Sequence, residues 1–298
     1  MEKNKKSILV LGKQGQVAQA LQGLLKSFDV TFTDHTETDF TQPTQVLKFV
    51  DDLKPEIIIN TAAYTAVDKA ESEPEITDIV NHKTPEALAK WAYSNKKTLV
   101  HFSSDYVFDG SGSEPRDEIA VTHPLSVYGR TKLAGDEAIL RSGAKGLIIR
   151  TSWVYSHSGQ NFFRTMLRLG AERDELSIVN DQIGSPTYAP DLAEVTLQLL
   201  WNSILKDQAG TQVYNICGVG YCSWYDFATE IFQLAPEFNI ALKVKSLKAI
   251  PSEAYLTPAK RPLNSRLNQS KLKLDFNLEM PHWKESLKRA FKRVSQKT

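Results

Sequence analysis

Short apolar runs alternate with amphipathic segments along the first half of the chain. The apolar runs are SILVLG, DVTFTD, PEIIINTAA, TLVHFSSDYVF and AKGLIIRTSWVY. Continuous runs of this length are typical of strands buried on both faces of a parallel sheet. Between them, ALQGLL, QVLKFVDDLK and TPEALAKWAYSNK have helical periodicity, and Thr84 is the expected N-cap before Pro85. The alternation predicts an α/β fold, a Rossmann-type doubly wound parallel sheet.

The first apolar run leads directly into a glycine-containing turn. Gly12, Gly15 and Ala18 have the spacing G-x-x-G-x-x-A between the strand and the next helical segment. Glycines at this point let the backbone turn tightly and approach a pyrophosphate, to which the helix N-terminus adds partial positive charge. The turn favours a dinucleotide site, and the alternative is an ordinary strand-to-helix connection.

An acidic residue ends the second apolar run. Asp34 follows Gly12 by 22 residues, where a carboxylate can accept hydrogen bonds from both hydroxyls of an adenosine ribose. It would repel a 2′-phosphate, and the neighbouring His35 compensates poorly when neutral. The alternative is a solvated loop residue. Asp39 and Phe40 follow and could lie along an adenine ring.

Tyr128 and Lys132 lie four residues apart in VYGRTKLAGDEAI, so a helix places them on one face. A fixed ammonium beside a phenol lowers the phenol pKa, which makes the pair a candidate general acid. Ser104 ends the fourth apolar run, where its hydroxyl could donate to a substrate carbonyl or to the tyrosine oxygen. Alone, each residue fits a solvated helix face or an ordinary loop.

The carboxyl ends of parallel strands meet at one edge of a sheet, where ligands gather. The residues expected at these ends are Gly12 to Gly15, Asp34, Ala62 and Ala63, Ser103 to Asp105, and Thr151 to Trp153. We therefore expect one crevice that brings the glycine turn and the Ser104, Tyr128 and Lys132 side chains together.

After about residue 150, short helical and irregular segments alternate without an internal repeat or a low-complexity linker. We expect residues 1–150 to form an NAD(P)-binding Rossmann domain. Residues 151–298 are expected to form mainly a smaller C-terminal substrate-binding domain, with some segments returning to the Rossmann sheet. Arg261 and Arg266 in AKRPLNSRL are candidates for binding a diphosphate, because guanidinium binds phosphate oxygens in bidentate fashion; the alternative is surface solvation.

Composition excludes several classes of protein. The 298 residues carry a net charge of +1, which gives no field to attract nucleic acid, and no stretch approaches the roughly 20 apolar residues of a membrane span. The six histidines have no metal-ligand spacing, and the chain lacks the G-x-S-x-G of hydrolases. Cys217 and Cys222 do not make a disulfide framework, and MEKNKK with a short ILVL run is not a secretory signal. We expect a cytoplasmic protein.

Longer segments carry a more specific resemblance. They include INTAAYTAVDKAESEPE, SSDYVFDG, PLSVYGRTKLAGDEAI, RTSWVYS, VNDQIGSPT and LTPAKRPLNSRL, spread from Ile8 to about Trp283. In these segments the chain resembles the extended short-chain dehydrogenase/reductases and, among them, the dTDP-4-dehydrorhamnose reductase family. The resemblance implies NADPH- or NADH-dependent reduction of the C4 ketone of dTDP-4-dehydro-L-rhamnose to dTDP-L-rhamnose.

The resemblance also implies roles for single residues. Tyr128 would donate the proton, Lys132 would hold the nicotinamide ribose and lower the tyrosine pKa, and Ser104 would keep the hydroxyl of a usual threonine. Asp105 and Trp153 would contact the sugar nucleotide. Cofactor positions would be Gly15, Gln16, Val17, Asp34, Asp39, Phe40, Ala63, Tyr64 and Thr65, beside Gly12 and Ala62 at the strand ends.

Some members of this family form dimers through a divalent metal held by glutamates. The aligned positions here are Ala20 and Pro190, so we expect no metal and either a monomer or a metal-free homodimer. Two alternatives to the implied function stay open. One is a reductase or epimerase of another nucleotide-linked 4-keto sugar. The other is a non-catalytic regulatory relative, similar to the beta subunit of methionine adenosyltransferase.

Overall fold

Six parallel strands form the central sheet in the computed structural model, which describes residues 6–206 and 209–296. Their order is β10-β5-β4-β3-β1-β2. The strands are β1 (Ser7–Leu11), β2 (Asp29–Thr33), β3 (Ile57–Asn60), β4 (Thr98–Ser104), β5 (Lys145–Thr151) and β10 (Thr211–Asn215). The order reverses between β1 and β3, which opens a crevice at the carboxyl ends of these strands. The predicted doubly wound parallel sheet is confirmed.

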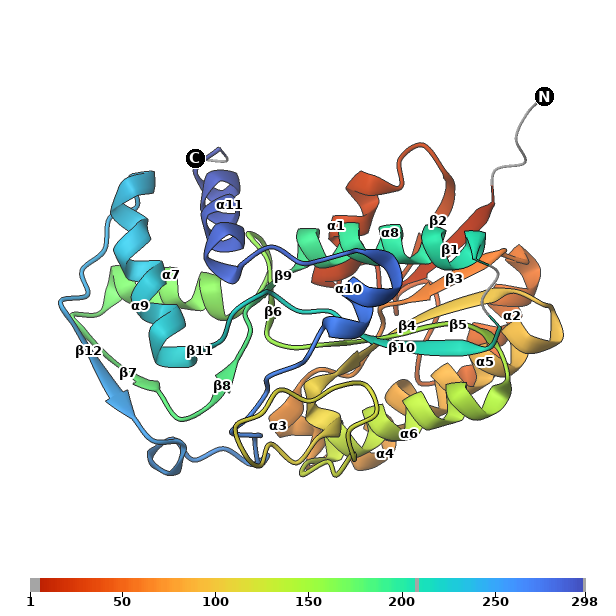
Figure 1. The fold of residues 1–298 in the computed structure, drawn as a ribbon, viewed down its shortest axis with the longest axis horizontal. Coiled ribbons are helices and arrows are strands. Elements are labelled where there is room, and N and C mark those ends of the chain that lie inside the picture. The colour runs from red at the N-terminus through yellow and green to blue at the C-terminus, as the bar shows by residue number, and fades with distance from the viewer. Residues whose placement is uncertain (1–5, 207–208, 297–298) are drawn as a thin grey trace.

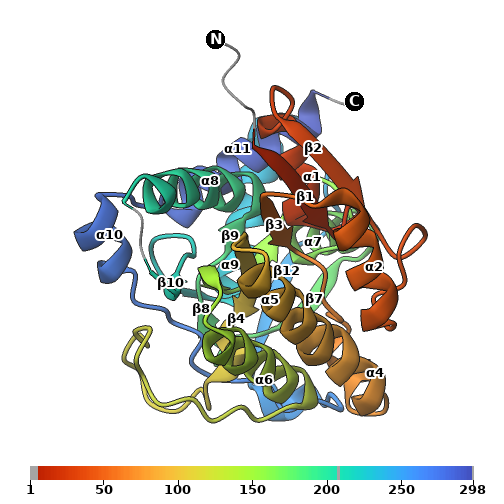
Figure 2. The same cartoon turned by 90° about the vertical axis from the view of Figure 1, so that its right-hand side faces the viewer.

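The apolar residues of β1 are divided between two cores. Ile8 and Val10 belong to one buried cluster, and Leu9 and Leu11 belong to another, because successive side chains of a strand point to opposite faces. The first cluster lies under α1 (Gln16–Leu24) and α8 (Ala189–Leu205). The second lies under α2 (Pro43–Leu53), α5 (Thr84–Ser94) and α6 (Val127–Ser142) (Figure 2). Helices on both faces of the sheet explain why both faces of β1 are apolar.

The start of α5 differs from the sequence prediction. Thr84 does not cap the helix, because a π-helical turn (Ile79–Lys83) and α4 (Pro74–Asp78) run directly into it. The Thr84 hydroxyl instead donates to the Phe40 carbonyl at 2.9 Å. Another short helix, α3 (Val67–Ala70), lies after β3 and borders the crevice.

The second half contains longer helices than the sequence pattern suggested. Its helices are α7 (Phe162–Glu172), α8, α9 (Trp224–Leu234), α10 (Ser270–Phe276) and α11 (Trp283–Ser295), and α8 has 17 residues. The prediction of only short helical segments was wrong there, because apolar side chains surround much of α8 and blur its periodicity. α8 and β10 return to the Rossmann sheet, where α8 packs on α1 and β10 pairs with β5.

The rest of the second half forms a smaller lobe beyond the carboxyl ends of the sheet strands (Figure 1). Its core joins α7, α9 and α11 through aromatic side chains that include Tyr155, Phe163, Phe227 and Phe291. Three two-stranded pairs support it: β6 (Val154–Tyr155) with β9 (Thr187–Tyr188), β7 (Glu175–Val179) with β12 (Ser246–Ile250), and β8 (Ile183–Gly184) with β11 (Cys222–Ser223).

Cys217 and Cys222 are buried and free. Within the described ranges, no helix combines the length and apolar character that crossing a membrane requires. Most of the N-terminal MEKNKK segment lies outside the described residues.

Candidate active site

A cleft of about 540 Å³ lies at the carboxyl ends of the sheet strands. The glycine turn after β1, the ends of β3, β4 and β5, the start of α6 and the first residue of α9 all contribute to its walls. Predicted residues that line it are Gly15, Gln16, Val17, Ala63, Thr65, Ser104, Asp105, Tyr128, Lys132 and Trp153. The expected convergence of strand ends therefore occurs, although Asp34 at the end of β2 is not among the lining residues.

The turn after β1 is built for close backbone approach. Gly12 has φ of +91°, and a Cβ at this position would lie 2.8 Å from the backbone nitrogen of Ala62. The Gly15 N–H donates to the Gly12 carbonyl at 2.8 Å, and Gly15 precedes α1 without a side-chain cap. The first N–H groups of α1 consequently point toward the cleft end of the turn, which fits a pyrophosphate.

Gln16 connects the glycine turn to the second half of the chain. Its Nε2 donates to the Val154 carbonyl at 3.3 Å, and Asn161 Nδ2 donates to its Oε1 at 2.9 Å. Both hydrogen bonds cross from α1 to segments after β5, so they fix how the smaller lobe meets the turn.

Asp34 lies beside the turn with its carboxylate already engaged. Thr36 donates to Oδ1 through its backbone N–H at 2.9 Å and its hydroxyl at 2.6 Å, and Gln14 Nε2 donates to Oδ2 at 3.1 Å. These hydrogen bonds lower the pKa of Asp34 to about 2. The residue is therefore a fully ionised, fixed carboxylate at neutral pH.

The other residues expected to bind the cofactor have varied positions. Asp39 is exposed and accepts from Thr41, whereas Phe40 is buried in the core near Val46 and Val50, and neither lines the cleft. Ala62 packs beside that core. Tyr64 is partly buried, and its hydroxyl donates to Glu73 at 2.5 Å.

Ser104 and Tyr128 meet in the cleft. Ser104 ends β4, donates to Asp105 Oδ1 at 3.0 Å and accepts the Tyr106 N–H at 3.2 Å. Burial raises the pKa of the Tyr128 hydroxyl above its usual value, and a hydrogen bond with Ser104 opposes this shift. Ser104 is thus placed to orient the phenol and to stabilise its deprotonated form.

Lys132 lies behind this pair and is 1% exposed. Its Nζ donates to the Phe102 carbonyl at 2.5 Å and lies 3.0 Å from Nε2 of His101. Burial lowers its pKa to about 8, against the opposing effect of Asp136. The expected lowering of the Tyr128 pKa by Lys132 does not prevail in this structure, because burial is the largest influence on both groups.

The residues expected to contact the sugar also line the cleft. Asp105 is 2% exposed, and burial raises its pKa to about 6, although Ser265 and Ser104 oppose the shift by hydrogen bonding. Trp153 lines the cleft together with Trp224. Sequence reasoning missed Trp224, which begins α9 and reaches Trp153 only through the tertiary fold.

Arg261 and Arg266 lie outside the residues that line the cleft. Arg261 Nη2 donates to Asp68 Oδ2 at 2.7 Å, and its hydrogen bond with Tyr106 places it at the border of the cleft. Arg266 donates to Asn264 Oδ1 at 3.1 Å, with its guanidinium 5.8 Å from the centre of the Tyr221 ring. Tyr106 was missed, although it stands in the SSDYVF segment.

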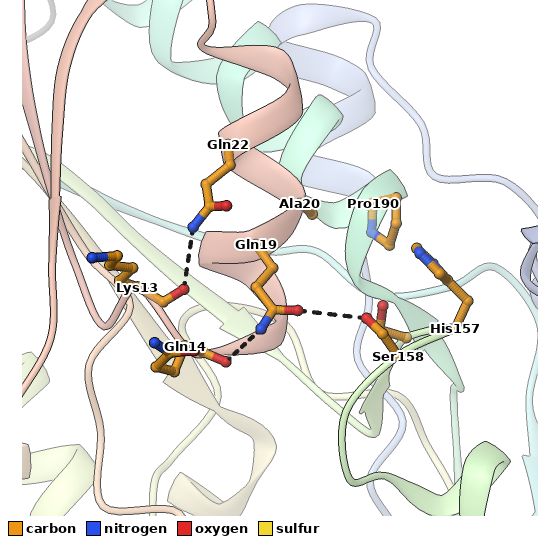
Figure 3. A pocket seen from close by; sticks show the side chains of 9 residues that line it. Lys13, Gln14, Gln19, Ala20, Gln22, His157, Ser158 and Pro190 are labelled. Atoms are coloured by element: carbon orange, nitrogen blue, oxygen red, sulfur yellow. Dashed lines mark hydrogen bonds between the residues drawn. The ribbon is translucent and has the colours of Figure 1, made fainter. Parts of the chain in front are cut away.

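A second cavity of about 440 Å³, distinct from the cleft, is lined by both Ala20 and Pro190 (Figure 3). Its other walls come from the glycine turn, α1 and the Ser156 to Ser158 segment, and no carboxylate side chain lines it. Across residues 6–206 and 209–296, no group of three or more His, Cys, Asp or Glu side chains could hold a metal ion.

Comparison with known proteins relates the whole chain to one family. The family model for the RmlD substrate binding domain matches residues 6–296. The dTDP-4-dehydrorhamnose reductase of Escherichia coli (strain K12) is 46% identical over 290 residues, which cover 95% of this chain and 96% of that protein. The spore coat polysaccharide biosynthesis protein SpsK of Bacillus subtilis (strain 168) is 33% identical, with 94% and 95% covered.

Solved structures agree with this relationship. A dTDP-4-dehydrorhamnose reductase from Clostridium acetobutylicum ATCC 824 is 38% identical and superposes with a TM-score of 0.89, covering 97% of this chain and 99% of that one. The dTDP-4-dehydrorhamnose reductase of Bacillus anthracis str. Ames, solved in complex with NADP, is 36% identical with the same TM-score and coverage. The chain therefore belongs to the dTDP-4-dehydrorhamnose reductase family.

Proposed function

We propose that this protein reduces the C4 ketone of dTDP-4-dehydro-L-rhamnose to dTDP-L-rhamnose with NADPH or NADH. The observation that carries the proposal is the single cleft that joins the Gly12–Gly15 turn to Ser104, Tyr128 and Lys132. Membership of the dTDP-4-dehydrorhamnose reductase family supports the choice of substrate.

The reduction needs a hydride at C4 and a proton on the C4 oxygen. The nicotinamide cofactor, when bound, supplies the hydride. Tyr128 donates the proton, and Ser104 polarises the carbonyl by turning its one hydroxyl proton from Asp105 to the C4 oxygen. Lys132 holds the nicotinamide ribose and contributes positive charge while it is protonated. Asp105 and Trp153 line the same cleft and orient the sugar there.

The glycine turn provides the cofactor site, because its Cβ-free backbone and the start of α1 fit a pyrophosphate. The Bacillus anthracis relative was solved with NADP, which supports NADPH as one cofactor here. The fixed carboxylate of Asp34 suits the ribose hydroxyls of NADH and disfavours a 2′-phosphate. We therefore expect the protein to use both cofactors, and we expect Asp34 to set the ratio of their kcat/KM values.

In this proposal the two halves of the chain bind different ligands. Residues 1–150 bind the cofactor, and residues 151–298 mainly bind the sugar nucleotide, while α8 and β10 complete the Rossmann half. Arg261, at the cleft border, and Arg266 are the candidates for its diphosphate. The free cysteines agree with a cytoplasmic setting.

The function is tested by mixing purified protein with dTDP-4-dehydro-L-rhamnose and either NADH or NADPH. We expect cofactor oxidation at 340 nm (the usual dinucleotide wavelength), with dTDP-L-rhamnose identified by NMR as the product. A parallel assay with a different nucleotide-linked 4-keto sugar measures specificity. Faster turnover of that second sugar, or no oxidation with either, would reject the proposal.

We further propose that catalysis needs no metal and that the protein is a monomer, with a metal-free homodimer as the alternative. A metal held between subunits needs several converging oxygen ligands, which Ala20 and Pro190 cannot provide. Light scattering and initial rates with and without EDTA provide the test. If chelation by EDTA abolished both a dimer and the activity, the proposal would be overturned.

A further inference from the structure

A line of buried polar side chains extends from Lys132 into the sheet. Asn60 ends β3, and His101 lies opposite it on β4. The exposed fractions of Asn60, His101 and Lys132 are 2%, 0% and 1%. Asn60 Nδ2 lies 3.1 Å from His101 Nδ1, and His101 Nε2 lies 3.0 Å from Lys132 Nζ. Of these three, only Lys132 lines the cleft.

The hydrogen bonds assign the proton of the His101 ring. The Ala62 N–H donates to Asn60 Oδ1 at 3.2 Å, so the amide NH₂ of Asn60 faces His101 Nδ1. An amide nitrogen only donates, which makes Nδ1 the acceptor. Burial and the nearby Lys132 hold the pKa of His101 well below its usual value, so the ring is neutral and has one proton. That proton is therefore on Nε2, directed at Lys132.

A hydrogen-bond donor directed at the Lys132 nitrogen favours the neutral amine over the charged ammonium. An ammonium has three N–H donors and no lone pair, whereas a neutral amine can accept the His101 Nε2–H. The Phe102 carbonyl accepts from either form. The other charged groups packed around Lys132 are Asp136, which favours the ammonium, and Arg150, whose Nε lies 3.4 Å from Asp136. Tyr128, one turn before Lys132 on α6, and Asp105 line the same cleft.

We propose that His101 is a positioning residue for Lys132: its Nε2–H fixes the lysine nitrogen against β4 and stabilises the neutral amine. This inference rests on the proposed reduction. After Tyr128 has given its proton to the sugar oxygen, the Lys132 ammonium returns a proton to the tyrosinate and becomes the amine. The amine then takes a proton from water, so each turnover consumes one solvent proton and leaves both side chains as they began.

NMR of the full-length protein tests the proton assignment without any assay of activity. Long-range ¹H–¹⁵N correlation of ¹⁵N-labelled histidines distinguishes Nε2–H from Nδ1–H, and the His101 signal is assigned by its absence from His101→Phe. We expect a neutral ring with the proton on Nε2 from pH 6 to pH 9. A proton on Nδ1, or a doubly protonated ring, would overturn the proposal. Failure of the protein to reduce the sugar would reject the function and leave this readout intact.

Kinetics test the effect on Lys132. His101→Phe keeps a ring of similar size and removes the donor, so we expect the alkaline limb of the kcat profile to move up by about 1 pH unit and turnover to fall ~10-fold. Asn60→Leu frees Nδ1 to take the proton, so the same upward shift is expected with His101 intact. His123→Phe, an exposed histidine, is the control. An unmoved or lowered alkaline limb in both variants contradicts the proposal.

Discussion

The indole of Trp153 stacks on that of Trp224, with ring centroids 3.5 Å apart and planes 10° from parallel. Trp153 follows β5, and its backbone is left-handed with φ of +48°, which is unusual for a bulky residue. Gly184 leaves room beneath the stack, since a Cβ there would lie 2.6 Å from the Trp153 ring. Trp224 is also anchored by donating from Nε1 to Gln182 at 3.2 Å. The pair forms a preorganised aromatic wall of the cleft.

Trp224→Ala should therefore weaken sugar-nucleotide binding. We expect loss of the indole wall to cost about 0.5–1.5 kcal/mol of sugar-nucleotide binding, the scale of one aromatic contact, so its KM should rise roughly 2- to 10-fold. The KM for NADPH should stay unchanged, because the glycine turn is untouched. Trp201→Ala, which removes a stack on Phe28 outside the cleft, is the matched control. Equal effects of the two variants on both KM values would show that the wall has no specific role.

Tyr128→Phe tests the general acid. The substitution removes only the hydroxyl, so cofactor affinity should persist while turnover falls ~10²-fold or more, the scale of general acid loss. Stopped-flow rates and NADPH titration measure the two quantities, with the exposed Tyr93→Phe as control. Near wild-type turnover would show that another group donates the proton.

Asp34→Ala tests cofactor discrimination. The carboxylate is ionised and fixed by Thr36 and Gln14, so its removal should lessen repulsion of a 2′-phosphate and shift preference toward NADPH. The ratio of kcat/KM for NADPH over NADH is the measurement. Asp52→Ala removes a similar charge from an exposed ion pair with Lys48 and should leave the ratio unchanged. If Asp34→Ala also leaves it unchanged, Asp34 does not face the ribose.

Asp105→Asn should stabilise the fold above neutral pH. The folded-state pKa of about 6 lies above the ordinary value of 3.8, so the protein loses stability as pH rises through this interval. We expect the variant to gain about 1–3 kcal/mol of unfolding free energy at pH 8, and less at pH 4. Urea unfolding at both pH values measures this. Asp109→Asn should instead lower the unfolding free energy at pH 8, because Ser111 donates hydrogen bonds to Asp109 and lowers its pKa.

Local pattern predicts the sheet and most of the cleft. The strand ends at Gly15, Ala63, Ser104 and Trp153 line it as expected, because parallel strands necessarily bring their carboxyl ends to one edge. The long α8 was missed because apolar residues surround it and weaken the periodicity that would identify a helix.

Residues brought in by tertiary contact could not be predicted in this way. Trp224 has no local motif, and its position beside Trp153 depends on how α9 packs against the end of β5. His101 lies within an apolar run and is indistinguishable there from a core histidine. Its contact with Lys132 arises only when α6 covers β4.

Transfer of deuterium tests the central claim most directly. The protein is incubated with dTDP-4-dehydro-L-rhamnose and NADPH that carries deuterium at both C4 positions of the reduced nicotinamide, and the product is analysed by NMR and mass spectrometry. We predict dTDP-L-rhamnose with one deuterium, located at sugar C4, and ~10²-fold less of this labelled product when Tyr128→Phe replaces the wild-type protein over the same interval. Deuterium at another carbon, or an altered sugar that carries none, would contradict the account.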